Sequence, residues 1–260
     1  MKRIVLAGAL LAAGAVGLLA QPTTAPAPAP KGPAPKSQGE LQALQAWQTA
    51  AQGGDTDAII KAVDDLLVKF PDTDFKDIVL CTEADAYQRK RDFIKAQIYA
   101  EQALAANPKS YQASVMLADI LAKHTGEHDL DRDEKLNKAV KYSQQTIELA
   151  AAAPKPRPDL ADAQWEAIKK GYIGQAQDDI GLAETVRRNW DAAITAFKAA
   201  AAADPQPAYR VHLANSLQSA GKFDEAIAIC DQVLAEPNLH PQIKAAAQGI
   251  KDSCTKAKAK

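Results

Sequence analysis

Two histidines stand close together in the segment HTGEHDLDRDEKL, residues 124–136. His124 and His128 have the i, i+4 spacing with which two histidines can bind zinc from one face of a helix. Gly126 between them weakens any helix, and the segment fixes no third zinc ligand. The pattern is therefore only a weak indication of a metal site.

Three alternating aspartates follow these histidines. Asp129, Asp131 and Asp133 are spaced as the first ligands of a calcium-binding loop are. That loop needs glycine at the position of Glu134 and a bidentate glutamate at the position of Val140, so both requirements fail. We expect no metal here: Asp131 or Asp133 makes a good N-cap for the next helix, and Glu134 is favourable in its first turn.

The rest of the chain offers no recognisable set of catalytic residues. No Gly-rich phosphate loop, G-x-S-x-G motif, H-E-x-x-H motif or paired set of cysteine ligands occurs. His212 has no nucleophile and carboxylate placed to complete a triad. With 31 basic against 32 acidic residues, the chain also lacks a strong field for nucleic acid or an anionic membrane. We expect no enzymatic activity, no cofactor and no nucleic-acid partner.

Residues 1–20 have the arrangement of a secretory signal peptide. Lys2 and Arg3 precede an apolar stretch that ends on Ala20, after which we expect cleavage. An uncleaved membrane anchor is the alternative, because the apolar run approaches the length that spans a bilayer. The first interpretation predicts an exported protein, periplasmic or secreted, without a membrane span after cleavage.

Residues 21–39, QPTTAPAPAPKGPAPKSQG, alternate largely between proline and small residues. Proline removes backbone hydrogen-bond donors, so we expect an extended, disordered linker. It can act as a spacer from a membrane or wall, as a ligand for a proline-binding module, or as a leader without a role. The folded region is predicted to span residues 40–256.

Three cysteines, Cys81, Cys230 and Cys254, match neither a zinc pattern nor a C-x-x-C redox pair. Cys230 lies on an apolar helical face, and an antiparallel helix after it should place residues near 246 opposite, well short of Cys254. We predict three buried, small apolar side chains and no intramolecular disulfide.

A helix-turn-helix pattern recurs along this chain, in which 47% of residues are hydrophobic but only 5% are aromatic. In residues 209–238, Ala214 and Ala226 stand where two antiparallel helices cross closely. Gly221 relieves the turn between them, and Pro237 stops the second helix. Similar patterns upstream predict units near residues 40–72, 74–108, 109–153, 159–205 and 206–238.

The third unit and its successor depart from a regular pattern. Residues 124–136 form an inserted loop that lengthens the third unit beyond a period of about 34 residues. The prolines of residues 154–159 exclude a helix, and they either bend the array or divide it into two rigid halves. A long helix should then run from an Asp159 cap toward Val186. Residues 240–256 are predicted to form a final amphipathic helix that caps the stack.

These patterns resemble the tetratricopeptide repeat, and the chain is identified as an exported, bacterial-type member of that family. The resemblance covers residues 40–256 and implies an all-α, right-handed α-solenoid of about five helix-turn-helix units with a C-terminal capping helix. In similar proteins the stacked first helices line a concave groove that receives a peptide or a partner's helix. The corresponding positions in this chain are Thr82, Asp85, Gln88, Arg89, Asp119, Lys123, His212, Asn215 and Gln218.

The resemblance implies a noncatalytic interaction scaffold of the bacterial cell envelope with a protein or peptide partner. The family's pocket for a C-terminal carboxylate uses lysine, arginine and asparagine, of which only Asn215 stands at a matching position, so that ligand is disfavoured. Two alternatives remain. One is a self-assembling structural envelope protein whose groove takes another copy's tail, and the other is a metal-dependent envelope protein that uses residues 124–136.

Overall fold

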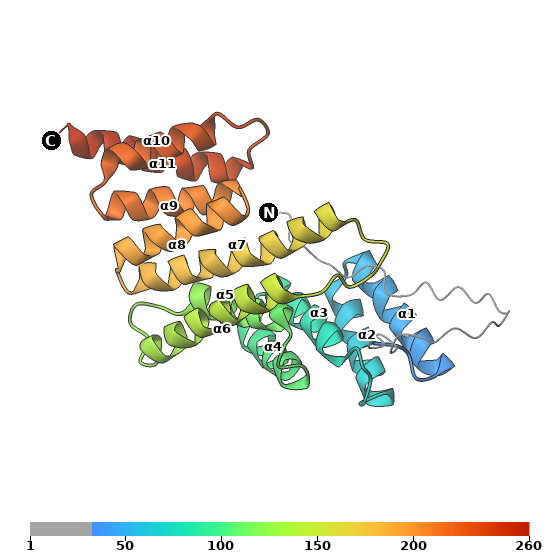
Figure 1. Cartoon of the computed structure of the whole chain (residues 1–260). Helices are drawn as coiled ribbons and strands as arrows, with labels where there is room; N and C mark the ends of the chain where they lie inside the picture. Colours follow the sequence, from blue (N-terminus) through green and yellow to red (C-terminus); the bar gives the residue numbers. More distant parts are fainter. Residues whose placement is uncertain (1–32, 260) are drawn as a thin grey trace. The chain divides into compact units, whose positions relative to one another are not determined.

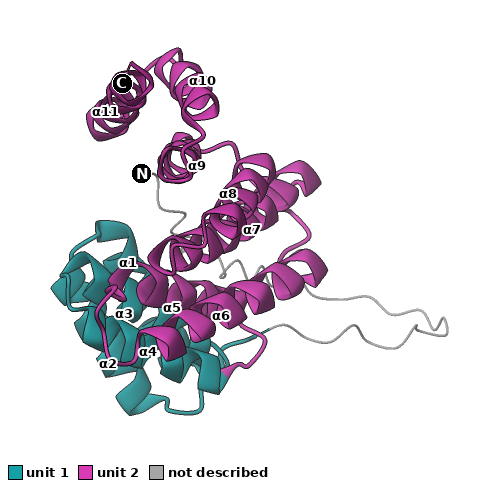
Figure 2. Ribbon diagram, turned by 90° about the vertical axis from the view of Figure 1, so that its left-hand side faces the viewer, with its two compact units in different colours: residues 1–106 teal, residues 107–260 magenta. Residues whose placement is uncertain are grey.

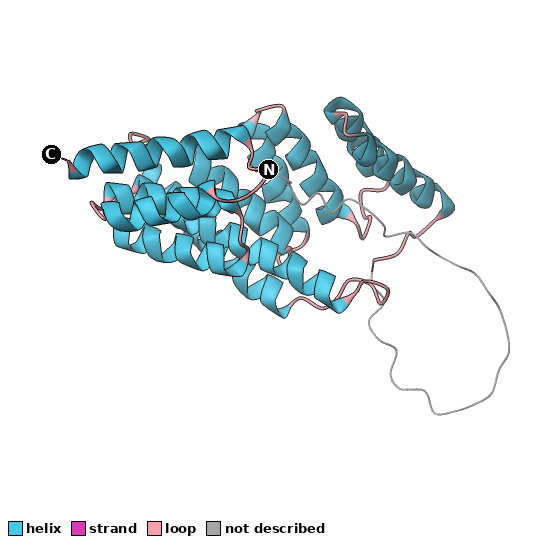
Figure 3. Cartoon of the chain, turned by 90° about the horizontal axis from the view of Figure 1, so that it is seen from above, coloured by secondary structure: helices cyan, strands magenta, loops and turns pink. Residues whose placement is uncertain are grey.

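The computed structural model describes residues 33–259, and within that range its regular structure is all helical, without a strand (Figure 1, Figure 3). The predicted signal peptide, residues 1–20, and most of the predicted linker, residues 21–39, lie outside the described residues. The helices are α1 (Gln38–Gly53), α2 (Thr56–Lys69), α3 (Lys76–Arg89), α4 (Phe93–Ala106), α5 (Tyr111–His124), α6 (Arg132–Ala152), α7 (Asp162–Val186), α8 (Trp190–Ala203), α9 (Pro207–Ser219), α10 (Phe223–Leu234) and α11 (Pro241–Lys258). None of them is both long and apolar enough to span a bilayer.

Consecutive helices pack as pairs. α1 packs with α2, α3 with α4, α5 with α6, α7 with α8, and α9 with α10. α11 packs against both α9 and α10 at the end of the chain, where a capping helix is expected. The prediction of an all-helical repeat fold is confirmed.

The chain forms two compact units, which divide between Ala106 and Asn107 (Figure 2). The first holds α1 to α4 and the second holds α5 to α11. The proline-rich segment 154–159 is not the boundary, because α6 and α7 on either side of it pack together within the second unit. That segment connects α6 to α7 without dividing the second unit.

Tight turns within the pairs place one residue in the left-handed conformation. Gly54 and Gly221 have φ angles of 77° and 75°, which glycine adopts without strain. Arg91 and Arg188 have φ angles of 62° and 60° in the turns before α4 and α8, where a residue with a Cβ costs about 1 to 2 kcal/mol. The packing of the two helices keeps this turn geometry where the sequence lacks glycine.

Small residues occupy the helix crossings. Ala96, Ala193 and Ala226, each in the second helix of a pair, are fully buried. Gly181 in α7 faces the ring of Phe197 in α8, and a Cβ on Gly181 would lie 2.6 Å from the ring atom Cδ1. Larger side chains at these positions would separate the paired helices, because interiors leave no room for extra methyl groups.

Replacement of Ala226 by leucine is expected to destabilise the last repeat by about 1 to 3 kcal/mol through overpacking. The matched control is Ala228→Leu on the same helix, because Ala228 is exposed and its replacement should change stability little. Thermal unfolding of both variants measures the difference. An unchanged melting midpoint for Ala226→Leu would show that Ala226 does not stand at a tight crossing.

The inserted loop is shorter than the predicted 124–136. α5 ends at His124 and α6 begins at Arg132, so the loop comprises residues 125–131, and Leu136 is fully buried inside α6. Asp131 is the residue before α6, but its side chain makes no capping hydrogen bond; it pairs instead with Lys135 at 2.9 Å. Leu136, which was predicted to lie in the loop, is therefore a buried residue of α6.

The expected Asp159 cap of the long helix is wrong. α7 begins at Asp162 after Ala161, which offers no capping side chain, and it ends at Val186 as predicted. The chain before α7 is held by an ion pair between Lys155 and Asp162, with Nζ and Oδ1 2.6 Å apart. The acidic side chain at the helix start therefore interacts with a preceding lysine rather than with orphan backbone N–H groups.

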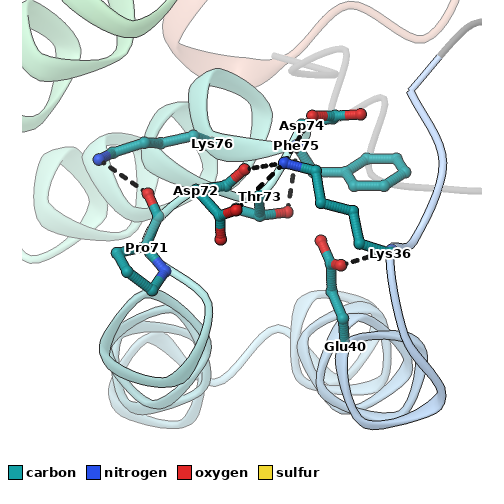
Figure 4. A network of polar contacts seen from close by, with 8 residues as sticks. All are labelled: Lys36, Glu40, Pro71, Asp72, Thr73, Asp74, Phe75 and Lys76. Carbon is teal, nitrogen blue, oxygen red and sulfur yellow. Dashed lines mark hydrogen bonds and ion pairs between the residues drawn. The ribbon is translucent and has the colours of Figure 1, made fainter.

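The last residues of the predicted linker pack onto the first unit (Figure 4). The Lys36 ammonium contacts the carboxylates of Asp72 and Asp74 at 3.5 and 3.1 Å, in the turn between α2 and α3. The backbone N–H of Lys36 donates to Glu40, which is almost fully buried in α1. These contacts, and the start of α1 at Gln38, place the fold's beginning earlier than the predicted residue 40.

The three cysteines are buried thiols, as their apolar surroundings predict. The expectation that Cys254 lies well away from Cys230 is wrong. Burial, and next the neighbouring Cys254 thiol, raises the pKa of Cys230 to about 11. α11 extends past the point opposite Cys230, and its last turns enter the same core as Ala226.

Candidate functional site

In the first unit, the candidate positions lie on α3 and are largely engaged with their own unit. Asp85 and Arg89 form an ion pair of 3.0 Å between Oδ2 and Nε. Arg89 also donates to the carbonyl of Gly54, in the turn between α1 and α2, at 2.9 Å. The Thr82 hydroxyl donates to the Ile78 carbonyl at 3.0 Å, and Gln88 is half-buried. These positions form a polar face of α3, and the opposite charges of Asp85 and Arg89 cancel.

In the second unit, the candidate positions lie on α5 and α9. Lys123 forms an ion pair with Asp119, one turn earlier on α5. Asn215 is exposed on α9, whereas Gln218 donates to the Ser253 hydroxyl of α11 at 2.7 Å. Gln218 thereby helps to hold the capping helix. His212 points to a neighbour that the sequence did not single out.

That neighbour belongs to α7, which packs against both α5 and α9. Oδ1 of Asp178 lies 2.8 Å from Nδ1 of His212, within hydrogen-bond distance. Gln175, one turn earlier, donates to Asp119 of α5 at 3.5 Å. The side chains of α7 therefore connect the predicted positions on α5 and α9.

Sequence reasoning missed these α7 residues although a signal was present. His212 was found two residues before Ala214, the small crossing residue of α9. Gly181 is the corresponding residue of α7, and the same offset points to Asp179 with Asp178 beside it. The segment QAQDDIG thus carries the information once the register of the unit is applied.

Three carboxylates, Asp119, Asp178 and Asp179, form what we call the acidic cluster. Asp179 is completely buried, and no group among the described residues donates a hydrogen bond to either of its oxygens. Burial raises the pKa of the Asp179 carboxyl well above its usual range, and Asp119 and Asp178 add to this effect against the opposing Lys123. The buried Asp179 carboxyl therefore keeps its proton to a higher pH than an exposed aspartate does.

Two further groups respond to the acidic cluster. Enclosure of the Lys123 ammonium lowers its pKa, but Asp119, Asp179 and Asp178 act in the opposite direction and leave it raised. Burial raises the pKa of the Tyr209 hydroxyl on α9, and the carboxylates, first Asp178, raise it further. The contacts of Asp119 with Lys123 and Gln175, and of Asp178 with His212, link the side chains of α5, α7 and α9.

The first unit contains a comparable buried acid. Glu83 of α3 is completely buried, and neither of its oxygens has a hydrogen-bond partner of normal geometry among the described residues. Burial raises the pKa of Glu83 to about 7, Asp64 adds to the effect, and the Tyr99 hydroxyl and the Lys95 ammonium oppose it. Its burial beside apolar helices makes it an internal group rather than a contact surface.

The acidic side chains of the loop of residues 125–131 form ion pairs and do not converge on one point. Lys135 pairs with Asp131 and lies 3.6 Å from Asp129, while Glu127 pairs with Arg188 at 2.7 Å. Across residues 33–259, no group of three or more His, Cys, Asp or Glu side chains is arranged to hold a metal ion. A hollow of about 510 Å³ lies elsewhere, between α7 and α8, and none of the acidic cluster lines it.

The chain matches a known repeat family in sequence and in fold. Residues 81–154 and 179–241, more than half of the chain, match the family model described as tetratricopeptide repeat. No curated protein sequence matches the chain.

Several solved structures have a fold similar to that of this chain. A thermophilic TPR protein from Thermus thermophilus is 16% identical, with a TM-score of 0.58 over 81% of this chain and 98% of that protein. MamA from Desulfovibrio magneticus RS-1, from residue 41 to its end, is 14% identical, with a TM-score of 0.57 over 76% and 94% of the two chains. At these identities the similarity concerns the fold alone. Together with the family match and the five helical pairs, it establishes that this chain belongs to the tetratricopeptide repeat family.

Proposed function

We propose that the chain is an exported, noncatalytic scaffold of the bacterial cell envelope that binds a peptide or helix of a partner protein. The fold supports a role in protein–protein interaction, because stacked repeats expose long surfaces rather than an enclosed pocket. The observation that carries the proposal is the joint surface of α5, α7 and α9, where side chains from three repeats interact. We call it the first-helix face.

The composition of this face favours a polar or charged partner segment. The face carries Asp119 and Lys123 on α5 and His212 on α9. Asn215 of α9 adds an exposed amide group. Such groups can bind both side chains and backbone of an extended segment. The basic start and apolar run of residues 1–20 support export to the periplasm or the exterior.

Crosslinking in intact cells, followed by affinity capture and mass spectrometry, tests the proposal. The variant Asp85→Lys plus Asp119→Lys reverses one charge among the predicted groove positions of each unit. We expect a specific partner to be captured by the native chain and lost with this variant, because like charges then replace favourable contacts. The mass of the captured chain also reports whether residues 1–20 have been removed.

The matched control is Asp65→Lys plus Asp191→Lys. It makes the same change in net charge on α2 and α8, the second helices of their pairs, where both aspartates are exposed. If the partner is still captured by the first variant, or is lost equally with the control, the result would contradict binding through the predicted groove positions. Circular dichroism of both variants checks that they remain folded.

A further inference from the structure

The acidic cluster of the second unit brings three carboxyl groups together beside one lysine. Asp119 pairs with Lys123, and Asp178 contacts His212, whereas the oxygens of Asp179 accept no hydrogen bond from a donor among residues 33–259 and its carboxyl interacts with the Asp119 carboxyl instead. A buried carboxyl without a hydrogen bond is costly and uncommon in folded proteins. A cationic donor that reached Asp179 would therefore supply hydrogen bonds that the described residues do not.

The same cluster can be reached from the surface at its edge. Side chains become progressively more exposed from Asp179, which is fully buried, through Asp178 at 5%, to Asp119 at 15%. Lys123 and His212, at 42% and 35%, stand at the outer rim. The Lys123 side chain is long and flexible, so its ammonium can move away from Asp119 when another cation takes its place.

We infer that the acidic cluster is an anchoring site for an arginine side chain of the partner segment. Asp119 and Asp178 would accept hydrogen bonds from the guanidinium group, and Asp179 beneath them would supply negative charge. Arginine suits this site because its five N–H donors form a rigid, planar fork that several carboxylate oxygens can share. This inference rests on the proposed function and specifies the chemistry of its partner.

Binding of the guanidinium should release a proton. Burial, together with Asp119 and Asp178, favours the protonated form of free Asp179, and Lys123 opposes this effect. Tyr209 and His212 of α9 interact with the same cluster through Asp178. A fixed positive charge favours the ionised carboxylate and so lowers the pKa of Asp179 toward its usual range. Proton release thus distinguishes an arginine inside the cluster from one that only contacts the surface.

The test uses the purified full chain and synthetic peptides. A labelled, extended peptide of about ten residues is long enough to cross three helices that are about 8–10 Å apart. It carries arginine at every third position between alanine and serine, and a second peptide carries glutamine at those positions. Fluorescence anisotropy at about 150 mM salt, where distant charges are screened, measures the two dissociation constants. We expect binding of the arginine peptide and none of the glutamine peptide.

Variants locate the site. Asp119→Asn and Asp178→Asn should each weaken binding of the arginine peptide by about tenfold, through loss of a charge-assisted hydrogen bond. Asp191→Asn is the matched control, because it removes one exposed carboxylate on α8 and should leave the affinity unchanged. Asp179→Asn replaces a neutral carboxyl with an amide of the same shape, so it should fold normally. Titration calorimetry in two buffers of different ionisation enthalpy should detect proton release with the native chain and none with Asp179→Asn.

Several results would overturn the inference. Equal binding of the glutamine peptide, or equal weakening by Asp191→Asn, would show that the acidic cluster does not select arginine. If the arginine peptide does not bind while a cellular partner is still captured through the predicted groove positions, the arginine site is contradicted and the proposed scaffold function stands. Concentration-dependent mass in light scattering that Asp119→Asn abolishes would identify a second copy of this chain as the occupant and contradict a separate partner.

Discussion

Replacing Glu83 by glutamine should stabilise the first unit by about 3 kcal/mol at about pH 8 and by almost nothing at about pH 4. Glu83 is completely buried in α3, and burial, with Asp64 as a smaller cause, raises its pKa to about 7. An ionised Glu83 is therefore costly in the folded protein, whereas glutamine has the same shape and no charge. Few surface substitutions produce an effect of this size.

The sign follows from the two protonation equilibria. The unfolded chain ionises Glu83 near its usual pKa of 4.5, and the folded chain does so only near 7. Between these values the unfolded state loses its proton first, so the native protein loses stability as the pH rises through this interval and no more above it. Below the lower value both states hold the proton, and Glu83 and glutamine are nearly equivalent.

Chemical unfolding at the two pH values, read by hydrogen exchange of the α3 and α4 amides, measures this difference. The control is Glu101→Gln on α4, because Glu101 is exposed and its variant should show no comparable pH-dependent gain. A gain from Glu83→Gln that is the same at both pH values would show that ionisation of Glu83 is not its cause.

Replacing Gly181 by alanine should destabilise the second unit by about 3 kcal/mol, although alanine is the better helix former. A Cβ at this position would lie 2.6 and 2.7 Å from the Cδ1 and Cζ atoms of Phe197, and closer still to Cε1. Phe197 is fully buried against Leu213 and Leu217, so its ring cannot move away without disturbing the same core. The overpacking outweighs the gain in helix propensity.

The matched substitution is Gly249→Ala in α11. A Cβ at Gly249 would meet nothing within 4 Å, so alanine should stabilise that helix by about 1 kcal/mol. Equilibrium unfolding of the two variants thus compares the same chemical change with opposite expected signs. In a Phe197→Leu background the cost of Gly181→Ala should fall, because the clashing ring atoms are gone, and an unchanged cost would point away from this contact.

The repeats could be predicted from the sequence because helix crossings and turns restrict residue types locally. Ala214, Ala226 and Gly221 have small side chains because helices cross or turn there, and these requirements depend on a few neighbouring residues. The periodic recurrence of such residues predicted the helical repeat fold, including the long helix that ends at Val186. The helix starts were less well predicted: Asp159 is not the cap of α7, and α6 begins at Arg132, so that Leu136 is a buried helical residue and not part of the loop.

The sequence by itself determined the class of protein, the register of its repeats and the identity of the small residues at the crossings. Only the tertiary structure decided that Asp179 and Glu83 are buried, that α7 brings Asp178 to His212, and that the chain divides after α4. The physical reason is that burial and desolvation depend on neighbours from other helices. The repeat register marks Asp179 in the polar stretch QAQDDIG as a position on the first helix of its unit, but only the packing of α7 against α5 and α9 decides that this aspartate is buried.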